Sequence, residues 1–241
     1  MHHEPSVVRA FVAGATGFTG REVVRGLCER QHGVFAHVRP DSRERAVWQE
    51  RFTSMGATVD STPWDESALE ATLTAHAITH VFCCIGTTRA RGKRAREHGA
   101  APETYETVDY GLTAMLARAT AAARPTARFI YLSATGASDG PGANSYLRWR
   151  HRAEEAVRTS GLTYVIARPS FITGARDEQR LAESVAARLG DAVLAVAGTL
   201  GAEKLRDRYR STDNATLAQA LIRVALDASP TSRVVEAEGL R

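Results

Sequence analysis

The chain has 241 residues, of which 44% are hydrophobic and 24% are charged, and its formal net charge is +4. This length suits one large α/β domain or two small ones, and the composition is ordinary for a water-soluble globular protein. No apolar run reaches the length of about 20 residues that crossing a bilayer requires. The first residues also lack the apolar core of a signal peptide. We therefore expect a cytoplasmic protein without a membrane partner.

The cysteines and basic residues exclude further classes of protein. Cys28, Cys83 and Cys84 are odd in number and two are adjacent, so we predict neither a disulfide framework nor a metal site. Only Lys93 and Lys204 are lysines, so 29 of the 31 basic residues (31 minus 2) are arginines. This ratio indicates a compositional bias. A basic isoelectric point alone does not predict a nucleic-acid partner.

An apolar run at residues 7–13 leads into three spaced glycines and then into a helical pattern. This order predicts a buried strand, a tight turn and a helix N-terminus, where unpaired N–H groups and the helix dipole attract an anion. Glycines let the backbone approach a pyrophosphate without an intervening Cβ atom. The alternative is a glycine-rich turn that binds no ligand. The predicted cofactor site here comprises Gly14, Thr16, Gly17, Phe18, Thr19 and Gly20.

The end of the second strand distinguishes between the two nicotinamide dinucleotides. We expect the first helix to end at Gly33 and a strand to cover residues 34–38. No carboxylate ends this strand; Arg39 stands there, 19 residues after Gly20, and Arg43 follows one turn later. Arginine matches a phosphate dianion in charge and in fork geometry, so we predict that this pair binds the 2′-phosphate of NADP(H). The alternative is two solvated arginines.

Strands and helices alternate along the rest of the chain. Strands are expected at residues 57–60, 80–86, 128–133, 163–168 and 234–236, and helices at 41–55, 66–75, 103–124, 145–160, near 178–190 and at 213–227. This alternation is typical of an α/β fold with a doubly wound parallel Rossmann sheet of six to seven strands, helices on both faces and a small C-terminal extension. We predict one NAD(P)-binding domain over residues 1–241, with substrate-side elements in about 170–241.

Several residues receive specific positions in this scheme. Val47 and Phe52 are expected to anchor the helix at 41–55, and Asp65 and Asp213 to cap the helices that follow them. Trp64 and Asp65 follow the third strand, beside the expected adenine; Asp65 is assigned to the cofactor and Trp64 to packing. A dinucleotide would cross the sheet at the end of the fourth strand. The predicted cofactor contacts there are Gly86, Thr87 and Thr88.

Three polar residues could carry chemistry. Ser133 ends the fifth strand, on the side where open α/β sheets bind ligands. Tyr146 and Arg150 lie four residues apart on the next helix and therefore share a face. A cation beside a tyrosine stabilises the phenolate, so Tyr146 could exchange a proton with a carbonyl or alcohol oxygen while nicotinamide carries the hydride. The alternatives are that Tyr146 is an aromatic residue on the helix surface and that Arg150 is a solvated charge.

Five stretches, in order, resemble the atypical branch of the short-chain dehydrogenase/reductase superfamily. They are GATGFTG (14–20), VFCCIGTTR (81–89), YLSATGA (131–137), YLRWRHRAEEAV (146–157) and ARPSFITG (167–174). Within that branch the chain resembles the Tat-interactive-protein oxidoreductase-like group, which is NAD(P)H-binding and NmrA-like. Arg39 also matches the NADP-preferring variant of the family.

The resemblance implies a set of site residues. Ser133 and Tyr146 correspond to the catalytic pair, and Pro169, Ser170 and Phe171 to the segment beside the nicotinamide. The superfamily lysine that holds the nicotinamide ribose and lowers the tyrosine pKa is replaced here by Arg150. Arginine keeps the positive charge, but its length and planar geometry differ from those of lysine.

With arginine at position 150 in place of lysine, two functions are compatible with the sequence. The first is an NADP(H)-dependent oxidoreductase that acts on a small carbonyl or alcohol, with Tyr146 as general acid/base, Ser133 as the orienting hydroxyl and Arg150 as the ribose ligand. The second is a non-catalytic NADP(H)-binding regulator or protein-interaction scaffold. The resemblance is compatible with a homodimer, with a protein partner and with a single chain.

Other interpretations are weaker. Five basic residues between Arg89 and Arg96 form either a solvated loop or a lid that attracts phosphates or an acidic substrate. No aromatic residues interleave with them, which argues against a nucleic-acid binder. Only 72 residues (241 minus 169) follow Pro169, which leaves little room for the larger substrate subdomain of a sugar-nucleotide epimerase.

Overall fold

The computed structural model describes residues 8–87, 103–170, 172–173, 212–228 and 231–241. Its elements in chain order are β1 (Arg9–Ala13), α1 (Gly20–Glu29), β2 (Gly33–His37), α2 (Arg45–Ser54), β3 (Thr58–Asp60), α3 (Glu66–Ala75), β4 (His80–Cys83), a π-helix (Tyr105–Leu112), α5 (Thr113–Ala123), β5 (Arg128–Leu132), α6 (Ser145–Arg158), β6 (Thr163–Arg168), β7 (Ile172–Thr173), β8 (Thr212–Asp213), α9 (Asn214–Leu226), β9 (Arg233–Glu236) and a 3₁₀ turn (Ala237–Leu240).

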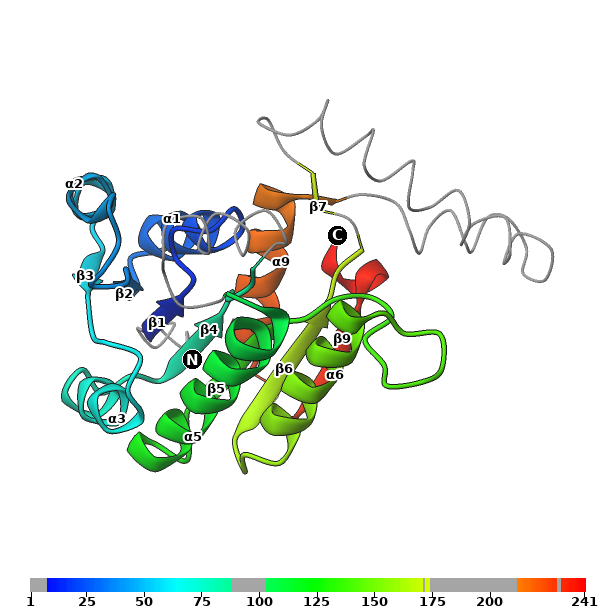
Figure 1. Ribbon diagram of the computed structural model, residues 1–241. Helices are drawn as coiled ribbons and strands as arrows, with labels where there is room; N and C mark the ends of the chain where they lie inside the picture. The colour runs from blue at the N-terminus through cyan, green and yellow to red at the C-terminus, as the bar shows by residue number, and fades with distance from the viewer. Residues whose placement is uncertain (1–7, 88–102, 171, 174–211, 229–230) are drawn as a thin grey trace.

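Seven of these strands form one sheet in the order β3-β2-β1-β4-β5-β6-β9, and every neighbouring pair is parallel. The short strands β7 and β8 pair separately. The chain order reverses between β1 and β4, since β2 and β3 lie on one side of β1 and the later strands lie on the other (Figure 1). Ligands of open α/β sheets bind at such a reversal, beyond the carboxyl ends of the strands. The predicted doubly wound parallel sheet is confirmed.

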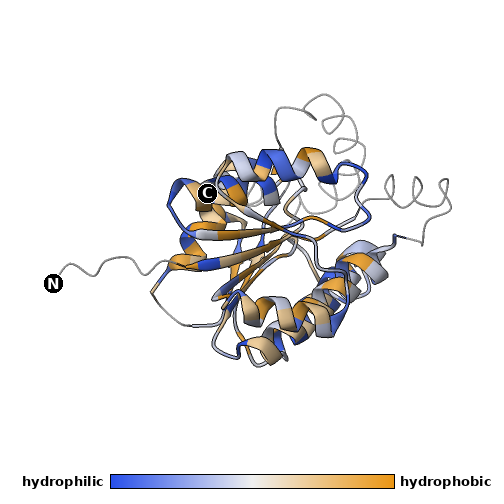
Figure 2. Cartoon of the chain, turned by 90° about the vertical axis from the view of Figure 1, so that its left-hand side faces the viewer, coloured by the Kyte–Doolittle hydropathy of each residue, from blue (hydrophilic) through white to orange (hydrophobic). Residues whose placement is uncertain are grey.

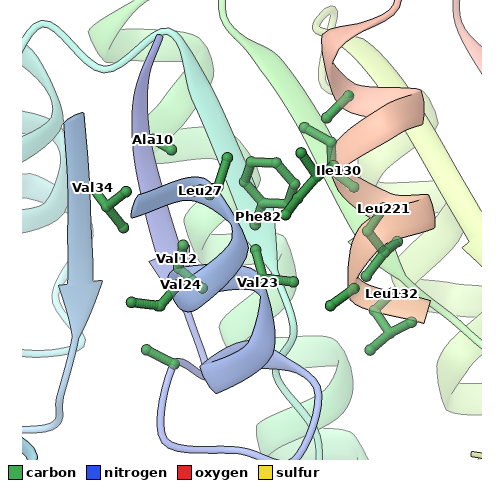
Figure 3. Packing of buried hydrophobic residues seen from close by; sticks show 14 of the residues in the cluster. Ala10, Val12, Val23, Val24, Leu27, Val34, Phe82, Ile130, Leu132 and Leu221 are labelled. Carbon is green, nitrogen blue, oxygen red and sulfur yellow. The ribbon is translucent and has the colours of Figure 1, made fainter. Parts of the chain in front are cut away.

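Two layers of helices cover the sheet, with a hydrophobic core on each face. Helices α1, α2 and α9 contribute to one core, and α3, α5 and α6 to the other. Figure 2 shows the sheet edge-on between these layers. In the first core, Val23, Val24 and Leu27 of α1 point toward β1 and β4, beside Phe82 and Leu221 (Figure 3). The strands are buried on both faces, which explains why their sequences read as continuous apolar runs.

Short polar side chains fix where the helices begin. Asp65 accepts a hydrogen bond from the backbone of Ala68, and Asp213 accepts two from the first turn of α9. Both predicted caps are confirmed. Asn144 caps α6 in the same way, and Thr104 forms a reciprocal capping box with Thr107 at the start of the π-helix.

Two local expectations are wrong. Helix α1 ends at Glu29, and Gly33 begins β2 opposite Arg9, while Gln31 takes the left-handed conformation (φ 60°) after the helix. Val47 is 64% exposed, so Phe52 alone of the two expected anchors enters the core. The long helix expected at 103–124 is confirmed over residues 105–123, where its first part is a π-helix and its second part is α5.

The remaining differences concern boundaries. Strand β4 stops at Cys83, three residues before the expected end at Gly86. Helix α6 and strand β6 follow their predicted ranges closely, and β9 joins the sheet beside β6. The helix expected near 178–190 lies outside the described residues. None of the described helices combines the length and the hydropathy that a membrane span requires.

Candidate active site

The glycine turn between β1 and α1 is shaped by the absence of side chains. Gly14 has φ +77°, and a Cβ atom there would lie 2.5 Å from the carbonyl oxygen of Cys84. A Cβ atom on Gly20 would overlap the carbonyl group of Gly14. Within the turn, the Gly17 amide donates to the Gly14 carbonyl at 2.9 Å. Two glycines are therefore required for the start of α1 to pack against the end of β1.

Backbone hydrogen bonds close the first turn of α1, where the Arg21 amide donates to the Gly17 carbonyl at 3.1 Å. Thr19 occupies the N-cap position in a helical conformation, and no side-chain hydrogen bond caps the helix. Helix α9, which packs beside α1 in the same core, also holds the turn, because Asn214 donates to the Phe18 carbonyl at 3.1 Å. Sequence reasoning missed Asn214, since it lies almost 200 residues further along the chain. Thr16 and Phe18 are half-buried in the same turn.

Carboxylates surround Arg39, contrary to expectation. The Arg39 guanidinium lies 3.0 Å from Glu103 and 3.5 Å from Asp41. No carboxylate follows β2 directly in the sequence, as predicted. The fold nevertheless brings a carboxylate to Arg39, because Glu103, which is 64 residues further along the chain, lies beside it. Arg39 is 42% exposed, whereas Glu103 is 17% exposed. Arg43 is exposed and forms no ion pair with a described residue.

The two residues that follow β3 have separate roles. Asp65 is exposed and uses one carboxylate oxygen to cap α3, as described above. Trp64 is half-buried and packs edge-on against the ring of His37, with 4.9 Å between ring centroids. His37 in turn hydrogen-bonds the carbonyl group of Thr62 at 2.8 Å. Trp64 thus packs against the sheet, in line with its predicted role.

A buried ion pair lies where β4 and β5 end. Arg150 of α6 lies 2.9 Å from Asp109 of the π-helix, and Asp109 is fully buried. The other oxygen of Asp109 accepts a hydrogen bond from the Thr87 amide at 3.0 Å. The guanidinium also passes beside Gly86, where a Cβ atom would lie 2.5 Å from its Nη2. Gly86 therefore leaves room for the arginine, which is a packing reason for that glycine.

Arg150 also binds the strand ends directly. Its Nη1 donates to the carbonyl groups of Leu132 at 2.8 Å and Ile85 at 3.2 Å, and to the hydroxyl of Tyr131 at 3.2 Å. Burial lowers the pKa of Arg150, but Tyr131, Tyr146 and Asp109 together raise it well above the ordinary value. The side chain is therefore a permanent buried cation. Its Nε is buried and makes no hydrogen bond to a described residue.

Tyr146 lies beside this cation. The Arg150 guanidinium carbon is 5.3 Å from the centroid of the Tyr146 ring, which is the geometry of a cation–π contact. The ring also meets Tyr105 edge-on at 5.2 Å and is half-buried. The structure thus brings Tyr146 and Arg150 together on one face of α6, as their spacing predicts.

Ser133 is held by a second buried charge on α6. Its hydroxyl donates to the fully buried carboxylate of Glu154 at 2.6 Å. Arg168 binds the same carboxylate through two nitrogens at 2.9 and 2.6 Å, and Arg158 binds it at 2.8 Å. Burial raises the pKa of Glu154, but the hydrogen bonds from Arg168 and Ser133 outweigh burial and lower it. The Ser133 hydroxyl therefore faces an ionised Glu154, a partner that sequence reasoning missed.

The segment after β6 lies next to this network. The carbonyl group of the buried Pro169 accepts a hydrogen bond from the Thr135 amide at 3.0 Å, and the Thr135 hydroxyl donates to the Arg168 carbonyl at 2.9 Å. Ser170 is half-buried directly after Pro169. Thr88, Phe171 and the basic segment Arg89–Arg96 lie outside the described residues.

These features fit a dinucleotide of the NAD(P)H type. Gly14 and Gly20 leave a cradle that Cβ atoms would fill, the first turn of α1 has no side-chain cap, and the Arg150 Nε–H has no acceptor in the part of the chain that the structure describes. No cluster of three metal-binding side chains occurs among the described residues.

Burial raises the pKa of the Cys83 thiol to about 11, so this cysteine is an unreactive core residue.

The sequence matches the NAD(P)H-binding family over residues 14–192. It is 33% identical over 173 residues to divinyl chlorophyllide a 8-vinyl-reductase of Oryza sativa subsp. indica, a match that covers 69% of this chain and 40% of the reductase. It is 30% identical over 178 residues to the mitochondrial protein fmp52 of Aspergillus fumigatus, covering 71% of this chain and 69% of that protein.

Solved structures show the same fold at lower identity. UDP-N-acetylglucosamine 4-epimerase from Bacillus cereus matches with a TM-score of 0.61 and 16% identity, covering 94% of this chain and 76% of the epimerase. A variant of actinorhodin polyketide ketoreductase, solved with NADPH, matches with a TM-score of 0.58 and 18% identity, covering 98% of both chains. From the sequence match over residues 14–192, the chain belongs to the NAD(P)H-binding family, which confirms the family predicted from its motifs.

Proposed function

We propose that this protein is an NADP(H)-dependent oxidoreductase of the atypical short-chain dehydrogenase/reductase type, acting on a small carbonyl or alcohol. The observation that carries the proposal is the contact of Tyr146 with Arg150, at 5.3 Å, beside the strand ends of a sheet that also holds the glycine turn. Parallel strand ends share one edge of the sheet, so a dinucleotide held at the turn reaches toward β4 and β5.

The binding residues have separate roles in this proposal. The turn from Gly14 to Gly20 holds the pyrophosphate with backbone amides at the start of α1. Arg39 and Arg43 bind the 2′-phosphate, for which guanidinium groups are suited in charge and geometry. Asp65, Gly86, Thr87 and Thr88 line the path across the sheet, and Pro169, Ser170 and Phe171 lie beside the nicotinamide. The bound cofactor supplies or accepts the hydride.

The chain's own residues move the proton. Tyr146 donates its hydroxyl proton to a carbonyl oxygen, or accepts the proton of an alcohol in the reverse direction. Arg150 stabilises the resulting phenolate by its positive charge and offers its free Nε–H to the ribose. The Ser133 hydroxyl donates to Glu154 in the structure, so it orients a substrate carbonyl by turning its O–H from Glu154 to that oxygen, and an alcohol keeps its single hydroxyl proton for Tyr146. A relative that is 33% identical is named as a vinyl-reductase, which supports reduction as the type of reaction.

The experiment is consumption of NADPH, followed by its absorbance, with a panel of small aldehydes and ketones. Tyr146→Phe should reduce turnover at least about 100-fold, the usual size of a general acid's contribution, while NADPH affinity is unchanged. Tyr105→Phe is the matched control, because its ring contacts Tyr146 but is assigned no proton transfer. Equal turnover by wild type and Tyr146→Phe would contradict the assignment.

A second function, a non-catalytic NADP(H)-binding regulator, is favoured by one observation. The terminal nitrogens of Arg150 are engaged by Asp109, Tyr131 and two strand carbonyls, which gives the side chain a structural role independent of a substrate. In that case the wild type binds NADPH but consumes none across the whole panel. Turnover with any substrate that depends on Tyr146 would exclude it.

A further inference from the structure

Glu103 holds two side chains that follow different strands. One carboxylate oxygen accepts a hydrogen bond from the Arg39 guanidinium at 3.0 Å, and the other accepts one from the Thr87 hydroxyl at 3.3 Å. Arg39 comes just after β2 and Thr87 just after β4. Strand β1 lies between β2 and β4 in the sheet, so these contacts cross the end of β1, where the glycine turn lies.

The position of Glu103 is fixed more firmly than that of an ordinary surface acid. Only 17% of its side chain is exposed, and the capped start of the π-helix follows immediately at Thr104. Asp41, the other acid beside Arg39, is 74% exposed and 3.5 Å away. Surface pairs such as Arg39–Asp41 contribute little, whereas a half-buried carboxylate held from two sides keeps its charge in place.

We propose that Glu103 sets the balance between NADP(H) and NAD(H), an inference that rests on the proposed function. A 2′-phosphate and the Glu103 carboxylate need the same Arg39 donors, and the two anions repel each other. A ribose 2′-hydroxyl carries no charge and can donate a hydrogen bond to the carboxylate, as acidic residues do in NAD sites. Glu103 therefore weakens the preference for NADP(H) that Arg39 would produce alone.

The test uses two probes that contain only the adenosine half of the cofactor. Adenosine 2′,5′-bisphosphate carries the 2′-phosphate and 5′-AMP does not, and binding of each is measured by calorimetry. Glu103→Gln keeps the size of the side chain and removes its charge. We expect it to raise the affinity for the bisphosphate about tenfold, the effect of roughly one nearby unit charge, and to change the 5′-AMP affinity less than about twofold.

Glu106→Gln is the matched control, because Glu106 is an exposed acid three residues after Glu103, in the first turn of the π-helix. A melting curve for each variant checks that both fold. The inference is overturned if Glu103→Gln changes the ratio of the two affinities no more than Glu106→Gln does, or if neither probe binds any variant. Probe binding that depends on Glu103, together with no turnover of NADPH, would refute the proposed oxidoreductase and leave the inference standing.

Discussion

The two ends of the candidate site are built in different ways. At the glycine turn the shape comes from backbone, because Cβ atoms at Gly14 and Gly20 would collide with carbonyl groups. At α6 the shape comes from buried charges, because Arg150 is paired with Asp109 and Glu154 with Arg168. The glycine turn therefore depends on the absence of side chains, and the α6 end depends on charged partners from distant segments of the chain.

This difference predicts how each end fails. A backbone-shaped site loses its ligand when a side chain is added, and the rest of the fold needs to adjust only locally. A charge-shaped site loses stability when one partner is removed, because the other charge is then buried without compensation. Substitutions at the glycine turn should therefore abolish binding with a smaller loss of stability than substitutions at the charged end.

The largest effect is expected at the charged end. Asp109→Asn leaves the buried Arg150 without its counter-ion, and we expect the free energy of unfolding to fall by about 3–5 kcal/mol. Chemical denaturation of the purified variants measures the change. Glu106→Gln, in the same π-helix but exposed, should have almost no effect. A loss below about 1 kcal/mol for Asp109→Asn would show that the pair is a surface-like contact.

The next largest effect tests the backbone-shaped end. Gly14→Ala adds a Cβ atom 2.5 Å from a carbonyl oxygen and strains a residue with φ +77°. We expect a stability loss of about 2–3 kcal/mol and the disappearance of nucleotide binding. Gly56→Ala has the same kind of strain at φ +89° but meets no atom within 4 Å, so it should keep full binding. If Gly14→Ala still bound the nucleotide, the glycine turn would not be a site shaped by the absence of side chains.

One source of pH-dependent stability lies at neither end. His80 begins β4, and burial lowers its pKa from 6.5 to about 4. The unfolded chain binds more protons between these values, so stability is complete above pH 6.5 and declines as the pH falls. We expect a loss of about 2 kcal/mol between pH 7 and pH 5, and a smaller loss in His80→Gln. Urea midpoints across this range measure it, and identical slopes in the two proteins would exclude His80.

The smallest effect concerns Ser133. Ser133→Ala removes one hydrogen bond to Glu154, whose carboxylate keeps Arg158 and Arg168, so we expect a loss of about 1 kcal/mol. Thermal and chemical unfolding measure this loss, and turnover should fall in the same variant. If Ser133→Ala changed stability and left turnover intact, Ser133 would be a packing residue of the charged end.

The sequence predicts the first end better than the second for a physical reason. Strand β1, the glycine spacing and the start of α1 are local signals, and so are the caps at Asp65 and Asp213. Even locally, the prediction for Gly33 is wrong, because a glycine after a helical pattern suits either a helix end or the start of a strand.

The charged end carries no comparable local signal. Asp109 and Glu154 look like solvated acids on helices, and only the packing of α6 against the π-helix and β6 shows that they are buried. Glu103 likewise reaches Arg39 only through the fold. The motifs identify Ser133, Tyr146 and Arg150 as candidates, but the partners that define their protonation and orientation come from tertiary structure.

The central claim is that the glycine turn and α6 serve one NADP(H) site. The most direct test is calorimetric titration of the wild-type chain with NADPH. We predict one binding site per chain with a dissociation constant in the micromolar range, about 1–100 μM, and its loss in Gly14→Ala but not in Tyr146→Phe. No binding at about 1 mM NADPH, or equal binding by the wild type and Gly14→Ala, would contradict the claim.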